Sequence, residues 1–263
     1  MATVNDILAC IHSFAPEYMK EDWDHVGLNC GHGDRQVQKI LVALDPFMDV
    51  CQEAKEMGAD LIVCHHALIW TPGFITDNNE WGRCALFLIE NNIACINAHT
   101  NLDCAPGGVN DILAAQLELE NVAVIDPKGT DVRGREYGLL RCGAVAEQPL
   151  ANFLAHVKEQ LDCEGLRYVD CGKSVCKVAV GGGACAGDMH KAAAAGCDTF
   201  VTADVKYNQF WDAKNLGINL IDAGHFHTEN PVCRYIADQL KAVFPEIEIQ
   251  ISAQHTDCAK FFQ

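Results

Sequence analysis

The stretch KILVALDPFMDVCQEAKEMGADLIVCHH, residues 39–66, carries the clearest signal of the fold class of this chain. It begins with an apolar run, KILVALD (39–45), which has the length of a buried strand. The next segment, MDVCQEAKEMG (48–58), has apolar residues at helical spacing until Gly58 stops the helix. A second strand-like run, DLIVCHH (60–66), follows. This order predicts a strand-helix-strand unit with parallel strands.

The second half of the chain repeats this order, with KVAVGGG (177–183), GDMHKAAAAG (187–196) and CDTFVTAD (197–204). An offset of 138 residues aligns the two stretches without a gap and matches six pairs of identical residues: Lys39/Lys177, Val42/Val180, Ala54/Ala192, Gly58/Gly196, Asp60/Asp198 and Val63/Val201. We interpret this as an internal duplication that gives two similar α/β lobes. The alternative is two generic strand-helix units that share this offset by chance.

The boundary between the lobes is predicted near DPKGTDVRGREYG (126–138), which is rich in turn formers and charge. The segment EIEIQISAQ (246–254) alternates like an edge strand and is predicted to return to the first lobe. We therefore expect intertwined lobes, one comprising residues 1–126 and 236–263 and the other residues 127–235.

Composition and charge indicate a folded, water-soluble protein. Of the 263 residues, 49% are hydrophobic and 21% charged, and the net charge is -17. An acidic surface repels phosphodiester backbones, which argues against nucleic acid as a partner. The 15 cysteines include no C-x-x-C pair, the N-terminal residues do not resemble a signal peptide, and no run approaches the ~20 apolar residues of a membrane helix. We expect reduced thiols, a cytoplasmic location and no membrane partner.

The two consecutive histidines, His65 and His66, lie where the second strand should end. In a continuing strand, successive side chains point to opposite faces, so both imidazoles could not reach one point. Functional side chains gather beyond the carboxyl ends of parallel strands, where each imidazole could bind a different ion of a pair. An isolated histidine at such a place is more often an ordinary hydrogen-bonded residue.

Two other predicted strands end in the same types of residue. His99 and Asp103 follow one strand, and His225, His227 and Glu229 follow its counterpart in the second half. Imidazoles with carboxylates suit a first-row divalent metal, and a carboxylate can bridge two ions. Asp103 and Glu229 are the candidate oxygen ligands.

Together these motifs resemble the Nif-three-like dinuclear metal-centre family, also called type 2 GTP cyclohydrolase I homologues, in its short form without an inserted domain. The matching stretches are DHVGLNCG (24–31), DLIVCHH (60–66), AHTNLDCAPGGVND (98–111), VGGGACAGD (180–188), TADVKYNQ (202–209) and DAGHFHTE (222–229). The resemblance implies two divalent metal ions per subunit (Zn, Fe, Mn, Co or Ni) bound by His65, His66, Asp103, His225 and Glu229. It also implies intertwined α/β/α lobes with one dinuclear site between them, and a ring-shaped homohexamer of three dimers.

Other residues near these motifs allow two interpretations. His227 departs from the family pattern and is either an additional ligand or a supporting imidazole. His99 is predicted to support a ligand or to move a proton. Cys64 and Cys104 flank ligands but are predicted to be buried structural thiols. The loop with Gly181 and Gly183 either cradles a phosphate or forms a tight strand-to-helix turn.

A pair of divalent ions favours hydrolysis, because it can acidify a bridging water and hold an oxyanion. The sequence therefore predicts a metal-dependent hydrolase of a small phosphate-bearing or nucleotide-like substrate, with Glu229 and His99 as catalytic residues. The family label suggests opening of the GTP ring. The alternative is a non-catalytic protein that stores metal or regulates a partner. Because the second half has Ala203 and Asp204 in place of the histidine pair, we expect one centre per chain.

Overall fold

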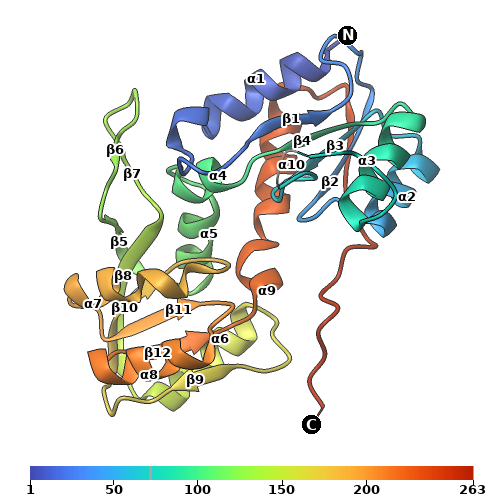
Figure 1. Ribbon diagram of the computed structural model, residues 1–263. Coiled ribbons are helices and arrows are strands. Elements are labelled where there is room, and N and C mark those ends of the chain that lie inside the picture. Colours follow the sequence, from blue (N-terminus) through green and yellow to red (C-terminus); the bar gives the residue numbers. More distant parts are fainter. Residues whose placement is uncertain (71–72, 263) are drawn as a thin grey trace. The chain divides into compact units, whose positions relative to one another are not determined.

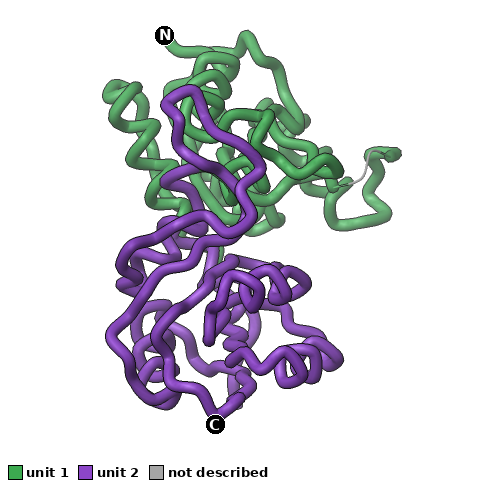
Figure 2. Tube along the Cα trace, turned by 90° about the vertical axis from the view of Figure 1, so that its left-hand side faces the viewer, with its two compact units in different colours: residues 1–105, 232–256 green, residues 106–231, 257–263 purple. Residues whose placement is uncertain are grey.

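The computed structural model describes residues 1–70 and 73–262. These residues form two compact units, which Figure 1 and Figure 2 show. Unit 1 comprises Met1–Ala105 and Val232–Thr256, and unit 2 comprises Pro106–Pro231 and the residues from Asp257 onward. Within the described residues, no helix has the length and apolarity needed to cross a membrane.

Unit 1 is built on a five-stranded sheet with the strand order β1-β4-β3-β2-β13. The strands are β1 (Gly27–Cys30), β2 (Lys39–Ala43), β3 (Leu61–Cys64), β4 (Ala94–Asn97) and β13 (Glu248–Ile251). β13, β2, β3 and β4 run parallel, while β1 is antiparallel to β4. The structure confirms the predicted strands within 39–45 and 60–66. It also confirms the predicted C-terminal strand, which pairs with β2 at the sheet edge.

Helices cover both faces of this sheet. α2 and α3 pack on the face that carries Leu41 and Ile62. Because neighbouring side chains alternate, Ile40 and Val42 face the other side, where α10 packs on β2 and β13 and α1 packs on α10. The helices of unit 1 are α1 (Val4–Phe14), the 3-10 turn η1 (Glu17–Met19), α2 (Met48–Met57), α3 (Glu80–Glu90), α4 (Thr100–Cys104) and α10 (Val232–Val243).

Unit 2 contains a six-stranded sheet with the order β5-β8-β10-β11-β12-β9. β10, β11 and β12 are parallel, and β5, β8 and β9 are joined by antiparallel pairing. The strands are β5 (Glu120–Ile125), β8 (Leu140–Gln148), β9 (Arg167–Val169), β10 (Val175–Val180), β11 (Thr199–Thr202) and β12 (Asn219–Asp222), with a separate hairpin of β6 (Gly129–Thr130) and β7 (Glu136–Tyr137).

The second sheet also lies between two layers of helices. α5 and α6 pack on the side of Val178 and Ile221, and α7 and α8 pack on the side of Ala179 and Phe200. The helices of unit 2 are α5 (Val109–Gln116), α6 (Leu150–Gln160), the 3-10 turn η2 (Cys185–Asp188), α7 (Met189–Ala194), α8 (Tyr207–Leu216) and α9 (His225–Glu229). Each unit is therefore an α/β structure of three layers.

The bounds of the two units differ from the bounds expected for the lobes. Residues 106–126, expected in the first lobe, belong to unit 2, because α5 packs on β8 and β5 pairs with β8. Residues 232–235 belong to unit 1, because they begin the continuous helix α10. The residues from Asp257 onward return to unit 2.

Most of the cysteines are buried, as their apolar surroundings predicted, whereas Cys176 and Cys258 are exposed. All 15 are free thiols, and Cys64 and Cys104 are buried. Burial raises the pKa of the Cys64 thiol. Its sulfur lies 3.3 Å from the carbonyl oxygen of Ile96, to which it donates. Cys64 is therefore held in the core of unit 1 as a neutral thiol.

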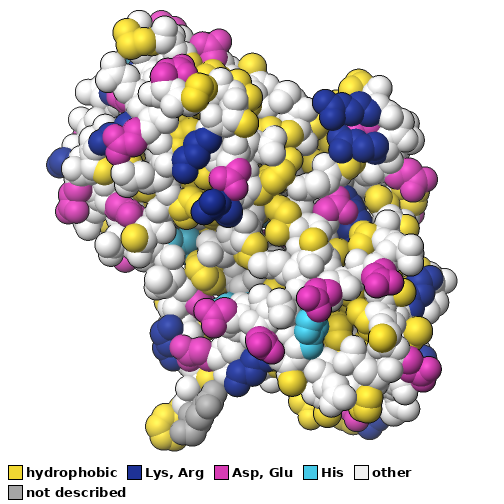
Figure 3. Space-filling view, turned by 180° about the vertical axis from the view of Figure 1, so that it is seen from behind, with side chains coloured by type: hydrophobic (Ala, Val, Ile, Leu, Met, Phe, Trp, Pro, Cys, Tyr) yellow, Lys and Arg dark blue, Asp and Glu magenta, His cyan; other side chains and the backbone are white. Residues whose placement is uncertain are grey.

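Charged side chains of both signs share the surface. On the face drawn in Figure 3, acidic side chains lie among basic and apolar ones. The acidic excess behind the net charge of -17 is carried on this face by scattered carboxylates.

Candidate metal centre

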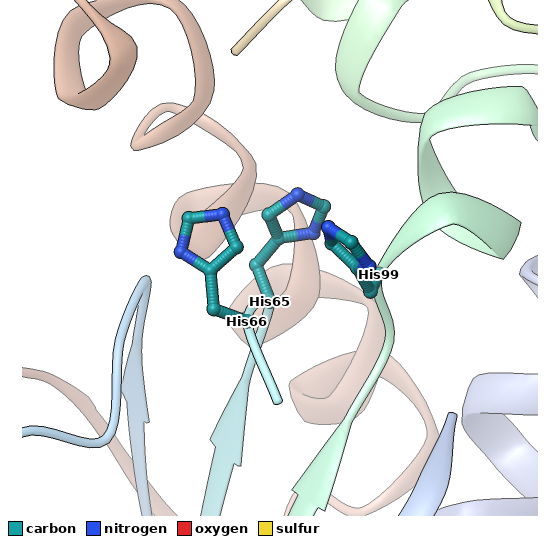
Figure 4. A group of neighbouring side chains, drawn as sticks. All are labelled: His65, His66 and His99. Carbon is teal, nitrogen blue, oxygen red and sulfur yellow. The ribbon is translucent and has the colours of Figure 1, made fainter. Parts of the chain in front are cut away.

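The carboxyl ends of β2, β3 and β4 carry a cluster of polar side chains in unit 1. Asp45 follows β2, His65 and His66 follow β3, and His99 follows β4. Because these parallel strands end at the same edge of the sheet, the side chains meet there. Ligand atoms of His65, His66 and His99 all lie within 4.8 Å of one another. Figure 4 shows these three rings, which we call the imidazole cluster.

The two consecutive imidazoles point to the same side because the strand ends before them. β3 ends at Cys64, and the N–H groups of His65 and His66 both donate to the carbonyl oxygen of Leu44, at 3.1 and 2.9 Å. The backbone has therefore left the strand conformation, and the centroids of the two rings are 4.9 Å apart. The strand therefore ends before the histidine pair, as predicted, and the alternation of a continuing strand does not apply to His65 and His66.

An oxygen acceptor holds the Nδ1 atom of each ring in the imidazole cluster. The contacts are His65 Nδ1 to Ala98 O at 2.8 Å, His66 Nδ1 to Asp45 Oδ1 at 2.7 Å, and His99 Nδ1 to Asp24 Oδ2 at 3.0 Å. Since these oxygens accept, the ring proton lies on Nδ1 and the lone pair of a neutral imidazole lies on Nε2. Histidines that bind metals are oriented in this way.

Two aspartates that brace the cluster were not among the sequence candidates. Asp24 is 2% exposed and accepts hydrogen bonds from the backbone N–H and hydroxyl of Thr100 as well as from His99. Burial alone would raise the pKa of Asp24, but these hydrogen bonds outweigh it and hold that pKa well below its usual range. Asp45 accepts hydrogen bonds from both His66 and His255. Burial would raise the pKa of Asp45, but these hydrogen bonds outweigh it and hold that pKa well below its usual range.

Weak sequence signals for these residues did exist. Asp24 opens the quoted motif DHVGLNCG, and Asp45 ends the strand-like run KILVALD at the same sheet edge as the histidine pair. His255 lies in none of the quoted motifs. The pairing of β13 with β2 brings its segment back towards Asp45.

Asp103 joins this cluster from the first turn of α4. His99 precedes α4 as its cap residue, and the N–H of Asp103 donates to the His99 carbonyl at 3.0 Å. One Asp103 carboxylate oxygen lies 3.5 Å from Nε2 of His65, and the side chain is 10% exposed. Unit 1 thus brings together the predicted ligands His65, His66 and Asp103, with His99 beside them.

Unit 2 brings together the other two predicted ligands, His225 and Glu229. They lie one turn apart on α9, with His225 Nε2 at 2.9 Å from the carboxylate of Glu229. The Nδ1 atom of His225 lies 2.8 Å from Asp204. Burial lowers the pKa of His225, but the carboxylates of Asp204 and Glu229 outweigh this effect and raise it to about 11. Asp204 was not a sequence candidate, although it occupies the position equivalent to His66 under the 138-residue offset.

The glycine-rich loop forms a tight turn against this group. A Cβ atom on Gly183, which has a φ of +60°, would lie 2.0 Å from the Glu229 carboxylate. The Gly182 N–H donates to Asn110 at 2.7 Å, and the Gly183 N–H donates to the Thr228 hydroxyl at 3.0 Å. These N–H groups are already used within the protein, so the geometry favours the tight turn over a phosphate cradle.

His227 is oriented differently from the predicted ligands. Its Nδ1 lies 3.1 Å from the Leu161 carbonyl oxygen, and its Nε2 lies 3.3 Å from the carboxylate of Asp257. Both ring nitrogens therefore contact oxygens of unit 2. This geometry favours a supporting imidazole over an additional ligand.

Comparison with known proteins identifies the family of this chain. The chain matches Duf34/NIF3 (NGG1p interacting factor 3) over residues 2–258. The chain belongs to the Duf34/NIF3 family. This confirms the resemblance found in the sequence motifs.

Relatives in the family cover nearly the whole chain. A protein of Clostridium perfringens named GTP cyclohydrolase 1 type 2 homolog is 34% identical, with 98% of this chain and 99% of that protein covered. A NIF3-related crystal structure from Bacillus cereus has a TM-score of 0.93 at 26% identity and covers 100% of this chain and 99% of its own. The structure of Staphylococcus aureus protein SA1388 has a TM-score of 0.87 at 28% identity, with 99% of both chains covered.

The donors present in each unit suit a divalent metal ion. Unit 1 offers imidazole nitrogens oriented through Nδ1 and a buried carboxylate, and unit 2 offers one imidazole and one carboxylate. Mixed nitrogen and oxygen donors suit Zn, Fe, Mn, Co and Ni. The residues of this NIF3 chain are therefore able to hold metal.

Proposed function

We propose that this NIF3 protein binds two divalent metal ions per subunit and uses them to hydrolyse a small phosphate-bearing or nucleotide-like substrate. The proposed ligands are His65, His66 and Asp103 from unit 1 with His225 and Glu229 from unit 2, which together would form one dinuclear centre. The observation that carries the proposal is the imidazole cluster, whose Nδ1 atoms are all held by oxygen acceptors.

The residues of the centre divide into ligands and groups that handle protons. Bound divalent ions would supply Lewis acidity and would lower the pKa of a water molecule. Glu229 is 4% exposed, so water competes weakly for its carboxylate, which would accept a proton during the reaction. His99 is oriented by Asp24 and offers Nε2 to the centre, where it would move a proton.

Metal analysis of the purified protein tests the dinuclear centre directly. We expect close to two ions per chain after dialysis, whichever metal is supplied. A content of one ion or less with all of Mn, Fe, Co, Ni and Zn would refute a centre of two ions. His99→Ala separates the possible roles of that residue: metal retained with turnover lost supports proton transfer, whereas metal lost makes His99 a ligand.

Hydrolysis is tested on a panel of phosphoesters, nucleotides and cyclic amides. The name of the relatives makes GTP the first substrate to assay, with a formylated or dihydropterin product. Glu229→Gln keeps an oxygen donor, so metal retained with turnover lost would support catalysis. If the metal-loaded protein turns over no member of the panel, the hydrolase proposal fails.

The alternative function is storage or delivery of metal, or regulation of a partner without catalysis. The same donors would serve it, because ligand types alone do not require a reaction. It predicts two bound ions, no turnover and rapid transfer of metal to a chelator. A stopped-flow measurement of metal release distinguishes this function, since a catalytic centre retains its ions through many turnovers.

We also propose that the protein assembles as a homohexamer of three dimers and that the chain arose by internal duplication. The family resemblance supports the hexamer, and light scattering on the purified protein tests its mass. Equivalent hydrogen bonds in the two units support the duplication: Asp60 accepts from the N–H groups of residues 38 and 39, and Asp198 accepts from those of residues 176 and 177.

A further inference from the structure

One carboxylate joins a proposed metal ligand to the C-terminal segment of unit 1. Asp45 Oδ1 lies 2.7 Å from Nδ1 of His66, and Asp45 Oδ2 lies 2.9 Å from Nε2 of His255. The side chains are 15%, 8% and 11% exposed, respectively, so water competes weakly for these hydrogen bonds. His66, Asp45 and His255 therefore form a largely shielded, partly buried chain of hydrogen bonds.

His255 reaches Asp45 because helix α2 holds the segment 252–255 in place. Ser252 continues from β13, and its N–H donates to the Val42 carbonyl at 2.8 Å. Glu53 of α2 accepts hydrogen bonds from the Ser252 hydroxyl, the Ala253 N–H at 3.0 Å and the Gln254 N–H at 3.4 Å. The Ser252 hydroxyl in turn accepts from the N–H of His255 at 3.2 Å. The segment is thus docked at three residues, Val42, Glu53 and Asp45.

We propose that Asp45 and His255 are positioning residues for the ligand His66, and that metal binding at His66 is coupled to docking of the segment 252–255. The inference rests on the proposed metal centre but assigns residues outside its ligand set. Asp45 fixes which nitrogen of His66 carries the proton, and His255 fixes the orientation of Asp45. Loss of either leaves His66 free to rotate or to change tautomer.

The coupling must act in both directions. If docking of His255 on Asp45 strengthens metal binding by a given factor, bound metal strengthens docking by the same factor. Partners of this kind typically change metal affinity by about 10- to 100-fold. The C-terminal segment would therefore report on metal occupancy although it carries no ligand.

Measurement of Co²⁺ and Zn²⁺ affinity by chelator competition tests the positioning role in the full-length protein. We expect His255→Ala and Asp45→Asn each to weaken binding by about 10- to 100-fold. His255→Gln keeps an N–H donor near the position of Nε2, so it should restore most of the affinity. Gln254→Ala, at the exposed neighbouring position, is the matched control and should bind like the wild type.

The visible absorption of bound Co²⁺ provides a readout that a merely structural role would not change. His255→Ala should alter the energy and intensity of the Co²⁺ bands, because the orientation of the His66 ring changes. His255→Gln should restore the wild-type spectrum. Equal spectra and affinities for wild type and His255→Ala would overturn the positioning role.

Amide hydrogen exchange tests the coupling without any assay of activity. Zn²⁺ should slow exchange at residues 253–255 of the wild type by the same factor by which His255→Ala weakens binding. In His255→Ala, Zn²⁺ should leave exchange there unchanged. Wild-type protein that binds no metal would refute the proposed function itself. Wild-type protein that binds metal without slower exchange would overturn only the coupling.

Discussion

Residues 39–66 of unit 1 and residues 177–204 of unit 2 have the same internal contacts but end in different residues. Lys39 donates from Nζ to the Met57 carbonyl at 2.9 Å, and Lys177 donates to the equivalent Ala195 carbonyl at 2.6 Å. The backbone groups of the two segments also match: Asp60 donates its N–H to Lys39, as Asp198 does to Lys177. These contacts hold the strand-helix-strand unit together in both units.

The difference lies beyond the last strand of each segment. Unit 1 continues with His65 and His66, which carry donor atoms for metal, whereas unit 2 continues with Ala203 and Asp204. Asp204 instead braces the imidazole of His225. The two segments therefore share contacts within the strand-helix-strand unit but differ in the roles of the residues at the strand ends, which fits the proposed duplication.

Exchanging the equivalent residues His66 and Asp204 for asparagine should produce the largest contrast. His66→Asn removes a proposed ligand, and we expect metal affinity to fall by more than the roughly 100-fold that marks the upper end for supporting residues. Asp204→Asn removes a supporting residue and should cost about 10- to 100-fold. Isothermal titration with Zn²⁺ measures both. Equal losses would mean that the two strand ends share one role.

Removing the equivalent aspartates should destabilise the two units to a similar degree. Asp60→Ala and Asp198→Ala each leave two backbone N–H groups without their carboxylate, which should cost about 1–3 kcal/mol. Urea unfolding followed by tryptophan fluorescence checks this. Trp211 is the tryptophan of unit 2, so the background Trp211→Phe reports on unit 1. A loss confined to one unit would contradict an equivalent role for the two aspartates.

Much of the fold was predictable from the sequence because its signals are local. Helical spacing, Gly58 as a helix stop and the apolar runs predict α2, β2 and β3, and the matching order predicts the equivalent elements of unit 2. The bounds of the units were less predictable, because they depend on the packing of α5 on β8 and of β5 beside it. Such long-range contacts leave no periodic pattern in a single sequence.

The candidate site was predictable only in part for the same reason. Histidines at strand ends mark His65, His66 and His99, but the residues that orient them are ordinary aspartates in the sequence. Asp24 is 75 residues from His99, and Asp45 is 210 residues from His255. Their roles depend on rings meeting at one sheet edge. The common orientation of His65 and His66 likewise depends on two N–H groups sharing one carbonyl.

The carboxylate of Asp204 beyond the last strand of unit 2 also predicts that stability and Zn²⁺ affinity depend on pH. The pKa of His225 is raised from 6.5 to about 11, because Asp204 and Glu229 outweigh the opposing effect of burial. The charged ring therefore stabilises the metal-free unit below pH 6.5, and this contribution is lost as the pH rises towards 11. Metal must displace the proton, so Zn²⁺ affinity should rise by up to about tenfold per pH unit in this window.

The variant Asp204→Asn tests whether the proton on His225 causes this pH dependence of Zn²⁺ binding. The variant removes one carboxylate that raises the pKa of His225, so the pH dependence of Zn²⁺ binding should shift to lower pH. Isothermal titrations with Zn²⁺ at several pH values between about 6 and 9 measure this shift. An unchanged pH profile would show that His225 does not exchange its proton for metal.

The smallest predicted effect concerns the glycines that end the equivalent helices. Gly58 and Gly196 have φ angles of +70° and +78°, and a Cβ atom at either position would meet no atom within 4 Å. Alanine at either position therefore suffers only from the left-handed backbone, at a cost of about 1 kcal/mol. Gly187 has the same open space without a left-handed φ, so Gly187→Ala is the matched control and should be neutral or slightly stabilising. Equal small losses of urea stability at Gly58 and Gly196, with none at Gly187, would show that both units end their helices through backbone conformation alone. A loss of stability at one glycine only would mean that the two helix ends contribute differently to the stability of their units.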